Sequence, residues 1–210
     1  MSPSPQPSPR LSSRFSPRVL WAGLRALLVL TLVTGVLYPL AITGVAQAFF
    51  PDRANGSVVT ADGRDVGSEL IGQTWNGPDG APDPHWFQPR PSNSGYDTGA
   101  TGSGQLAAGD PTLVETVRQA REDVAAFNGV PVADVPPDAV TGSGSAIDPH
   151  ISPAYADLQV ARVAERNGLP RGTVQELVDA HTEGRDLGVL GGERVNVLLL
   201  NLALRDLLDG

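Results

Sequence analysis

The longest run of apolar and uncharged positions lies near the N-terminus, over residues 26–50. These 25 residues contain no charge, and about 20 apolar residues suffice for a helix to cross the hydrocarbon core of a bilayer. We therefore predict a transmembrane helix over residues 19–50. Gly35, Pro39 and Gly44 interrupt it, and such residues either mark close packing by a neighbouring helix or are simply commoner in membrane helices than in soluble ones.

A cleaved secretory signal is the alternative interpretation of this segment. Ala46-Gln47-Ala48 has the small-x-small pattern that signal peptidases recognise. The apolar core of a signal peptide, however, is about 7 to 15 residues long, which is shorter than the uncharged run. The length of the run therefore favours a retained span.

Charge is unevenly distributed about this span. Residues 1–50 carry four arginines and no acidic residue, whereas the whole chain has a net charge of −8, so the remaining 160 residues carry −12. The more positive flank of a span usually stays in the cytoplasm. We expect a disordered cytoplasmic tail over residues 1–18, which are rich in Pro and Ser, and an extracytoplasmic domain over residues 51–210.

The composition excludes several classes of function. The chain has no cysteine, which excludes disulfides, thiolate metal sites and cysteine nucleophiles. All fifteen basic residues are arginine, and without lysine the chain cannot form a Walker P-loop. An acidic chain is also poorly suited to neutralise phosphates, so we expect no nucleic-acid partner.

The pattern in residues 51–210 predicts one α+β domain. Short β segments are predicted at residues 57–60 and 70–75, next to Asp-Gly and Asn-Gly turn signals. Trp86-Phe87 could begin another strand. The class is therefore α+β, with one N-terminal transmembrane helix followed by a single extracytoplasmic domain.

Capping residues mark the helices of this domain. Asp-Pro and Ser-Pro starts with Asn-Gly ends predict helices over residues 111–128 and 153–167. Thr173 with Glu176 forms a capping box that predicts a third helix start. Residues 195–208 are almost wholly apolar and fit either a buried helix or a buried strand that runs into one.

Residues 76–110 form a long stretch dense in Gly, Pro, Ser, Asn and Asp. Aromatic residues lie in it or at its edge, and aromatics are depleted in disordered linkers, so we expect an ordered surface loop that docks on something. Aromatic residues and arginine are the usual hot spots of interfaces. We therefore take four residues as candidate interface anchors: Trp86, Phe87, Arg90 and Tyr96.

Candidate catalytic or metal-binding chemistry is sparse. His150 and His181 stand near acidic residues and could form a metal site if the fold brought them together, but their spacing matches no known ligand motif. The Gly-rich runs 98–104 and 141–145 lack the context of a dinucleotide fingerprint or a nucleophile elbow. We expect no catalytic site and no metal site. The alternative function is a membrane-anchored external enzyme or metal-binding protein that uses His150 and His181.

Six stretches of the sequence share the order and spacing of a known family: 36–40, 86–92 with 96–97, 148–153, 159–164, 181–185 and 195–198 with 201–202. Together they resemble the C subunit of the Kdp potassium-transporting P-type ATPase, the KdpC family. The resemblance extends over nearly the whole chain from about Arg25. It departs from the usual family pattern at residues 103–111, where the family carries an Asn-bearing Ser-Asn-Leu stretch and Asn-Pro.

The resemblance implies a single-pass subunit of a bacterial cell-membrane complex that imports potassium by using ATP. Its partners would be a potassium-channel-like subunit, a P-type ATPase subunit and a small membrane peptide. Tyr38 and Pro39 of the span are then further interface candidates.

The resemblance also implies that the chain serves in assembly and acts as a catalytic chaperone that raises the ATP affinity of the ATPase subunit. The chain would hold no cofactor of its own, and ATP would be held mainly by the partner ATPase subunit. An external domain cannot touch ATP on the cytoplasmic side. The charge-based topology therefore favours an indirect effect on ATP binding.

Overall fold

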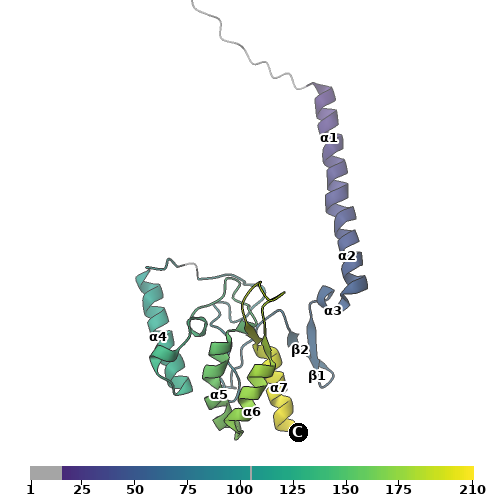
Figure 1. Cartoon of the computed structure of the whole chain (residues 1–210). Helices are drawn as coiled ribbons and strands as arrows, with labels where there is room; N and C mark the ends of the chain where they lie inside the picture. Colours follow the sequence, from purple (N-terminus) through teal and green to yellow (C-terminus); the bar gives the residue numbers. More distant parts are fainter. Residues whose placement is uncertain (1–15, 105) are drawn as a thin grey trace, which may run out of the picture. The chain divides into compact units, whose positions relative to one another are not determined.

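A computed structural model describes residues 16–104 and 106–210 of the chain (Figure 1). It contains two compact units, Met1–Ala54 and Asn55–Gly210. The predicted disordered tail lies almost wholly outside the described residues. An N-terminal apolar helix followed by mixed helices and strands confirms the α+β prediction.

The first unit is a long apolar helix with one irregular turn. It comprises α1 (Pro17–Leu32), a π-helical turn η1 (Val33–Leu37) and α2 (Tyr38–Phe49), followed by the short α3 (Pro51–Ala54). At about 1.5 Å per residue, the 33 residues of Pro17–Phe49 extend roughly 50 Å, which exceeds the roughly 30 Å hydrocarbon core. The helix is therefore long and apolar enough to span a membrane, and it begins two residues before the predicted start.

The π-helical turn ends at Leu37, two residues before Pro39. Proline has no backbone N–H, and its ring collides with the carbonyl four residues earlier in a regular α-helix. The helical turn is wider here, because the backbone N–H of Tyr38 donates to the carbonyl of Val33, five residues earlier. The sequence-predicted interruption is thus a single wide turn within a continuous helix.

The second unit begins with a β-hairpin. Strands β1 (Val58–Ala61) and β2 (Arg64–Ser68) pair antiparallel around the left-handed turn residues Asp62 and Gly63. The strand predicted at residues 70–75 is wrong. This segment instead passes close to other backbone, because a Cβ on Gly72 would lie 2.8 Å from the carbonyl oxygen of Asp148.

Two helices have the predicted bounds and caps. Helix α4 (Pro111–Asn128) begins where the Asp110 carboxylate accepts from the N–H of Thr112 at 2.8 Å. Helix α5 (Pro153–Asn167) begins where the Ser152 hydroxyl accepts from the N–H of Tyr155 at 3.1 Å. Each ends at a glycine in the left-handed region, as Asn-Gly predicts.

The third helix and the C-terminal segment differ from the expectations in detail. Helix α6 (Arg171–Ala180) begins after Pro170 and makes no side-chain cap, so the predicted capping box is wrong. The C-terminal segment follows the second alternative, a strand that runs into a helix: β5 (Arg194–Asn196) leads directly into α7 (Val197–Asp209). The Asn196 side chain makes this junction by accepting from the N–H groups of Leu198 and Leu199.

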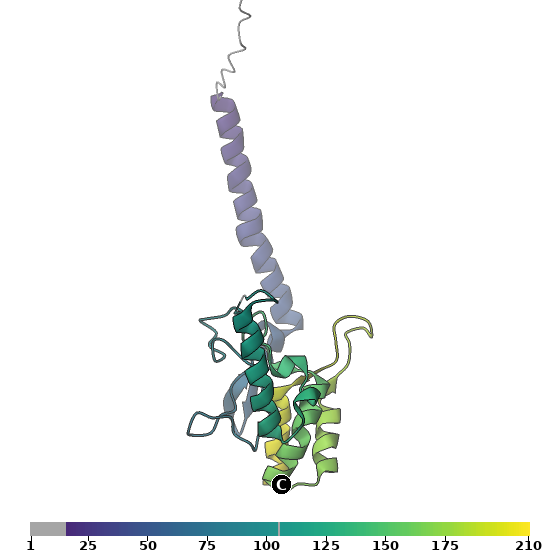
Figure 2. The same cartoon turned by 90° about the vertical axis from the view of Figure 1, so that its left-hand side faces the viewer.

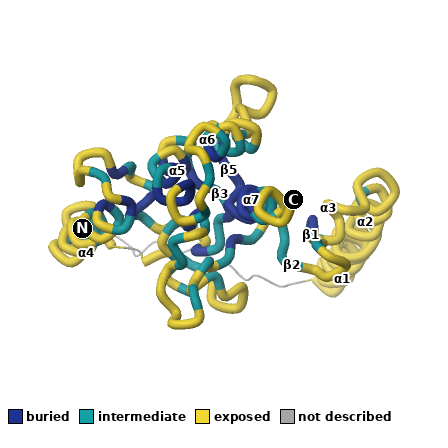
Figure 3. The backbone as a smooth tube through the Cα atoms, turned by 90° about the horizontal axis from the view of Figure 1, so that it is seen from below, coloured by how far each residue is buried: buried dark blue, intermediate teal, exposed yellow. Residues whose placement is uncertain are grey.

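A small sheet and three helices enclose the core. Strands β3 (His150–Ile151), β5 and β4 (Thr182–Glu183) form an antiparallel sheet in that order, and two 3₁₀ turns, η2 (Val132–Asp134) and η3 (Pro137–Ala139), follow α4. Buried residues concentrate on α5, α7, β3 and β5 (Figure 3). The fully buried side chains include Val163, Val174, Val195, Leu200 and Leu204.

Candidate functional site

The aromatic segment over residues 84–92 packs onto its own domain. The Phe87 side chain is fully buried in the core and thereby anchors the segment to its own domain. Asn201 on α7 accepts from the N–H of Phe87 and donates to its carbonyl, both at 2.9 Å. This side-chain amide satisfies the backbone groups that a neighbouring strand would satisfy, which is why Trp86-Phe87 begins no strand.

A second buried amide holds the next residue in the same way. Gln159 on α5 accepts from the N–H of Gln88 at 2.7 Å and donates to its carbonyl at 3.1 Å. The Gln88 side chain donates in turn to the carbonyls of Trp75 and Asp83. Residues 76–110 are thus tied to the domain by buried polar contacts at residues 87 and 88.

Arg162 on α5 completes this polar network. Its guanidinium donates to Gln159, to Asn128 and to the carbonyls of Pro84 and Trp86, and it stacks over the Phe127 ring at 4.5 Å from the ring centroid. Burial lowers the pKa of Arg162 to about 10, so the group remains charged at neutral pH. The charged guanidinium of Arg162 therefore holds the aromatic segment over residues 84–92 against α5.

Arg90 also makes contacts within the domain. It donates to the carbonyls of Thr141 and Gly142 and lies 3.3 Å from the Asp148 carboxylate. Burial opposes ionisation of Asp148, but hydrogen bonds from the backbone and ring of His150, with the charge of Arg90, bring the net pKa of Asp148 below its ordinary value. Arg90 and Asp148 therefore join residues 90, 141–142 and 148–150 at one corner of the domain.

The other predicted anchors differ in how much surface they offer. Tyr96 is half-buried, and its hydroxyl donates to the carbonyl of Arg90 at 2.7 Å, while burial raises its pKa. Trp86 is partly buried, with its ring centroid 5.4 Å from that of Trp75. Tyr38 and Pro39 are exposed on the apolar helix. The structure brings Trp86, Phe87, Arg90 and Tyr96 into one region, and their role at an interface stays a prediction.

His150 and His181 occupy different elements. His150 lies on β3 and pairs with Asp148, whereas the ring of His181 lies 2.8 Å from the Leu177 carbonyl at the end of α6. Within residues 16–104 and 106–210, no three His, Cys, Asp or Glu side chains gather as metal ligands would. The geometry thus offers no support for the metal-binding alternative.

Sequence reasoning missed an apolar loop tip between β4 and β5. Leu187, Val189 and Leu190, the apolar tip, are 90%, 74% and 58% exposed. Figure 2 shows this yellow-green loop standing clear of the other elements of its domain. The signal in the sequence was a Leu-Gly-Val-Leu-Gly-Gly stretch between charged residues, which resembles an ordinary flexible turn.

The loop that carries the apolar tip has a defined frame. Asp186 and Leu190 exchange two backbone hydrogen bonds of 2.9 Å, and Arg194 at the base pairs with Glu183 at 2.9 Å. Leu187 has a φ of 53°, which a bulky residue rarely adopts. Such outliers are typical of functional segments, and this one displays apolar side chains to solvent.

Comparison with known proteins gives a consistent result. A family model described as KdpC, K+-transporting ATPase, c chain, matches residues 20–206. The potassium-transporting ATPase KdpC subunit of Streptomyces coelicolor is 53% identical over 209 residues, covering 90% of this chain and 93% of the relative. The subunits of the same name from Streptomyces avermitilis and Kineococcus radiotolerans are 52% and 50% identical, covering 90% and 87% of this chain and 94% and 91% of those relatives.

Proposed function

Because the chain belongs to the KdpC family of potassium-transporting ATPase subunits, we propose that it is the membrane-anchored, non-catalytic subunit of an ATP-driven, high-affinity potassium import complex. The apolar helix anchors it in the bacterial cell membrane as a single span. The domain of residues 55–210 lies outside the cytoplasm and docks on the potassium-conducting subunit. The P-type ATPase subunit and a small membrane peptide complete the complex.

The observation that carries this proposal is the apolar tip. Monomeric proteins rarely hold several large aliphatic side chains together in solvent, and such patches usually mark interaction sites. Here the three side chains stand on a loop held by two backbone hydrogen bonds and an ion pair. A preformed loop of this kind loses little conformational freedom on binding, which favours a docking role.

The charges around the apolar tip favour a protein partner over lipid. Residues 183–194 carry Glu183, Asp186 and Glu193 against Arg185 and Arg194, a net charge of −1, and contain no aromatic residue. Segments that enter a lipid surface usually carry basic and aromatic residues. The tip therefore fits an apolar depression on another subunit.

An external domain acts on ATP only through the membrane subunits. Four arginines precede or begin the apolar run, and the positive flank of a span usually faces the cytoplasm. ATP is then held by the ATPase subunit on the other side of the membrane. The chain thus raises the ATP affinity of that subunit by stabilising one arrangement of the complex, and it holds no cofactor of its own.

Single-cysteine labelling tests the topology, since the native chain has no cysteine. Ser16→Cys and Asp179→Cys place one thiol at an exposed position in each unit. In intact spheroplasts, a membrane-impermeant maleimide should label the chain with cysteine at 179 and leave the chain with cysteine at 16 unlabelled. Labelling only at position 16 would overturn the topology and make direct contact with ATP the leading mechanism.

Co-purification tests the docking role. Replacing Leu187, Val189 and Leu190 together by serine should lower recovery of the other subunits by about tenfold or more, because the desolvated apolar contact is lost. Serine at the exposed Val132, Val114 and Leu70 provides a matched control in the same domain. Equal recovery with both triple variants would refute docking through the tip.

A further inference from the structure

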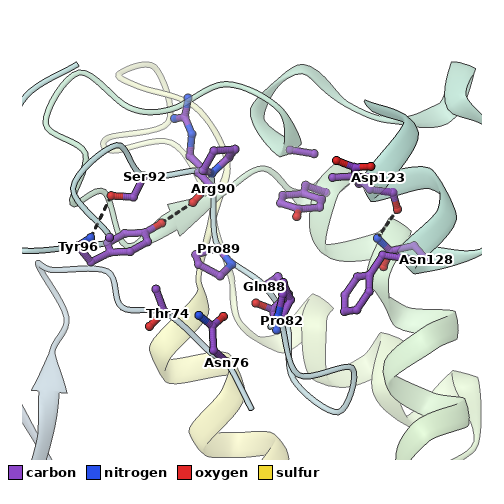
Figure 4. A pocket seen from close by; sticks show the side chains of 16 residues that line it. Thr74, Asn76, Pro82, Gln88, Pro89, Arg90, Ser92, Tyr96, Asp123 and Asn128 are labelled. Carbon is purple, nitrogen blue, oxygen red and sulfur yellow. Dashed lines mark hydrogen bonds between the residues drawn. The ribbon is translucent and has the colours of Figure 1, made fainter. Parts of the chain in front are cut away.

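A cavity of about 440 Å³ opens between α4, the start of α5 and residues 88–96 (Figure 4). Its volume lies in the range of small-molecule sites, roughly 300 to 1,000 Å³. Tyr96 and Asp123 stand on opposite sides in Figure 4, with Pro82 and Pro89 between them. The walls are mostly carbon: they come from prolines, aromatic rings and aliphatic side chains, including Pro91, Val124, Phe127, Ala139 and Tyr155.

One polar group in this wall has no protein partner. Tyr155 lines the cavity with only 4% of its surface exposed, and its hydroxyl makes no hydrogen bond to protein within the part of the chain that the structure describes. Burial raises the pKa of Tyr155 to about 12, and the hydroxyl is therefore protonated at neutral pH. It can donate to a bound molecule or accept from it.

The charged groups at the cavity differ in availability. Arg90 is engaged with Asp148 and with the carbonyls of Thr141 and Gly142. Asp123 at the exposed rim has one oxygen that accepts from Gln119 at 2.9 Å and a second oxygen with no protein donor among the described residues. The charge open to a ligand is therefore negative.

Arg162 is the other cation near this region, and it does not line the cavity. It lies over the Phe127 ring, and its donors are taken by Gln159, Asn128 and two carbonyls. The rings of Tyr96 and Tyr155 also line the cavity. Aromatic faces together with a carboxylate are the groups that attract alkylammonium ions, quaternary ones above all.

We propose that this cavity binds a small organic ammonium ion that carries a hydroxyl or carbonyl group. The ammonium group lies between the Asp123 carboxylate and the aromatic rings, and the polar end meets the Tyr155 hydroxyl. The prolines and Val124 contact the alkyl part. This binding site is separate from the apolar tip, so the domain carries a ligand site as well as a docking surface.

Choline is a suitable probe because its neutral isostere, 3,3-dimethylbutan-1-ol, has the same shape without the charge. The full chain is purified in a maltoside detergent with Trp21→Phe, which leaves Trp75 and Trp86 as the fluorophores. Trp75 lies between Thr74 and Asn76, which both line the cavity, so its emission reports on occupancy. Choline should bind at least about tenfold more tightly than the isostere at matched ionic strength set with potassium chloride.

Two conservative variants separate the two contacts. Asp123→Asn keeps the acceptor for Gln119 and removes the charge, and it should weaken choline binding about tenfold with no effect on the isostere. Tyr155→Phe removes only the unpartnered hydroxyl, so it should leave the fold intact and weaken both probes. Glu165→Gln, at an exposed position of α5 outside the cavity, is the matched charge control and should change neither.

The ammonium group occurs both in free amines and in lipid headgroups, and a titration with glycerophosphocholine distinguishes them. Binding of choline alone indicates a free amine, and equal binding of both indicates a headgroup. The inference is overturned if choline does not bind, if the isostere binds as tightly, or if Asp123→Asn leaves choline affinity unchanged. A thermal unfolding curve for each variant confirms that the compared chains are folded.

Discussion

The aromatic segment over residues 84–92 and the apolar tip are both irregular segments, yet the domain uses them in opposite ways. The aromatic segment places Phe87 in the core and has its backbone groups bound by Asn201 and Gln159. The apolar tip has a framed backbone and leaves Leu187 90% exposed. Residue type alone therefore does not identify an interface: what matters is whether the fold already supplies a partner.

The largest expected effect follows from truncating the buried aromatic. Phe87→Ala removes a fully buried ring and should lower the free energy of unfolding by about 3–5 kcal/mol, measured by urea denaturation. Leu187→Ala is the matched change at the tip and should cost far less. Similar losses of unfolding free energy for the two variants would show that Leu187 contributes to the packing of the domain as Phe87 does.

The next effect follows from removing one amide clamp. Asn201→Leu leaves the N–H and the carbonyl of Phe87 buried without partners, which should cost about 2–4 kcal/mol of unfolding free energy. Asn93→Leu, at an exposed position of the same loop, should change it little. A neutral result for Asn201→Leu would mean that the segment holds its place without this clamp.

A pH-dependent effect is expected at the corner where Arg90 meets Asp148. The pKa of Asp148 is lowered in the folded state, so its contribution to stability is present above the ordinary value of 3.8 and is lost as pH falls through the folded-state pKa. Asp148→Asn should therefore destabilise the domain at neutral pH, and the difference should shrink as pH falls below 3.8 and vanish only below the folded-state pKa. Acid titrations of unfolding for both chains check this, and a constant difference at all pH values would contradict it.

The smallest effect on folding is expected at the apolar tip. Serine at Leu187, Val189 and Leu190 should change the free energy of unfolding by no more than about 0.5 kcal/mol, because these side chains are already in solvent. Chemical denaturation measures this directly. A large loss of stability would mean that the tip packs within its own domain, and it would remove the basis for docking.

The sequence predicted the elements whose signals are local. Helices α4 and α5 begin and end at the expected residues, because Asp110, Ser152, Gly129 and Gly168 act within one turn of their own position. The apolar helix was predictable from length and charge alone. Pro39 predicted an interruption of this helix, but the sequence did not predict that the interruption would be a π-helical turn.

Apart from the capping box at Thr173, the features that the sequence did not predict depend on contacts distant in sequence. Residues 70–75 have a strand-like pattern, but Gly72 lies against residues 96 and 148, which no local pattern reveals. The buried position of Phe87 depends on its contact with Asn201, which stands 114 positions away. The cavity needs α4, α5 and residues 74–96 together, so none of its residues could be grouped in advance.

Photo-crosslinking in the native membrane tests the central claim most directly. A photoreactive amino acid is placed in separate chains at Leu187, at the exposed Asp179 and at Trp86. Each chain is irradiated in cells that express the whole complex. The account predicts a product with the potassium-conducting subunit from position 187 and none from position 179. It is contradicted if position 187 yields no product with another subunit while the same group at Trp86 does.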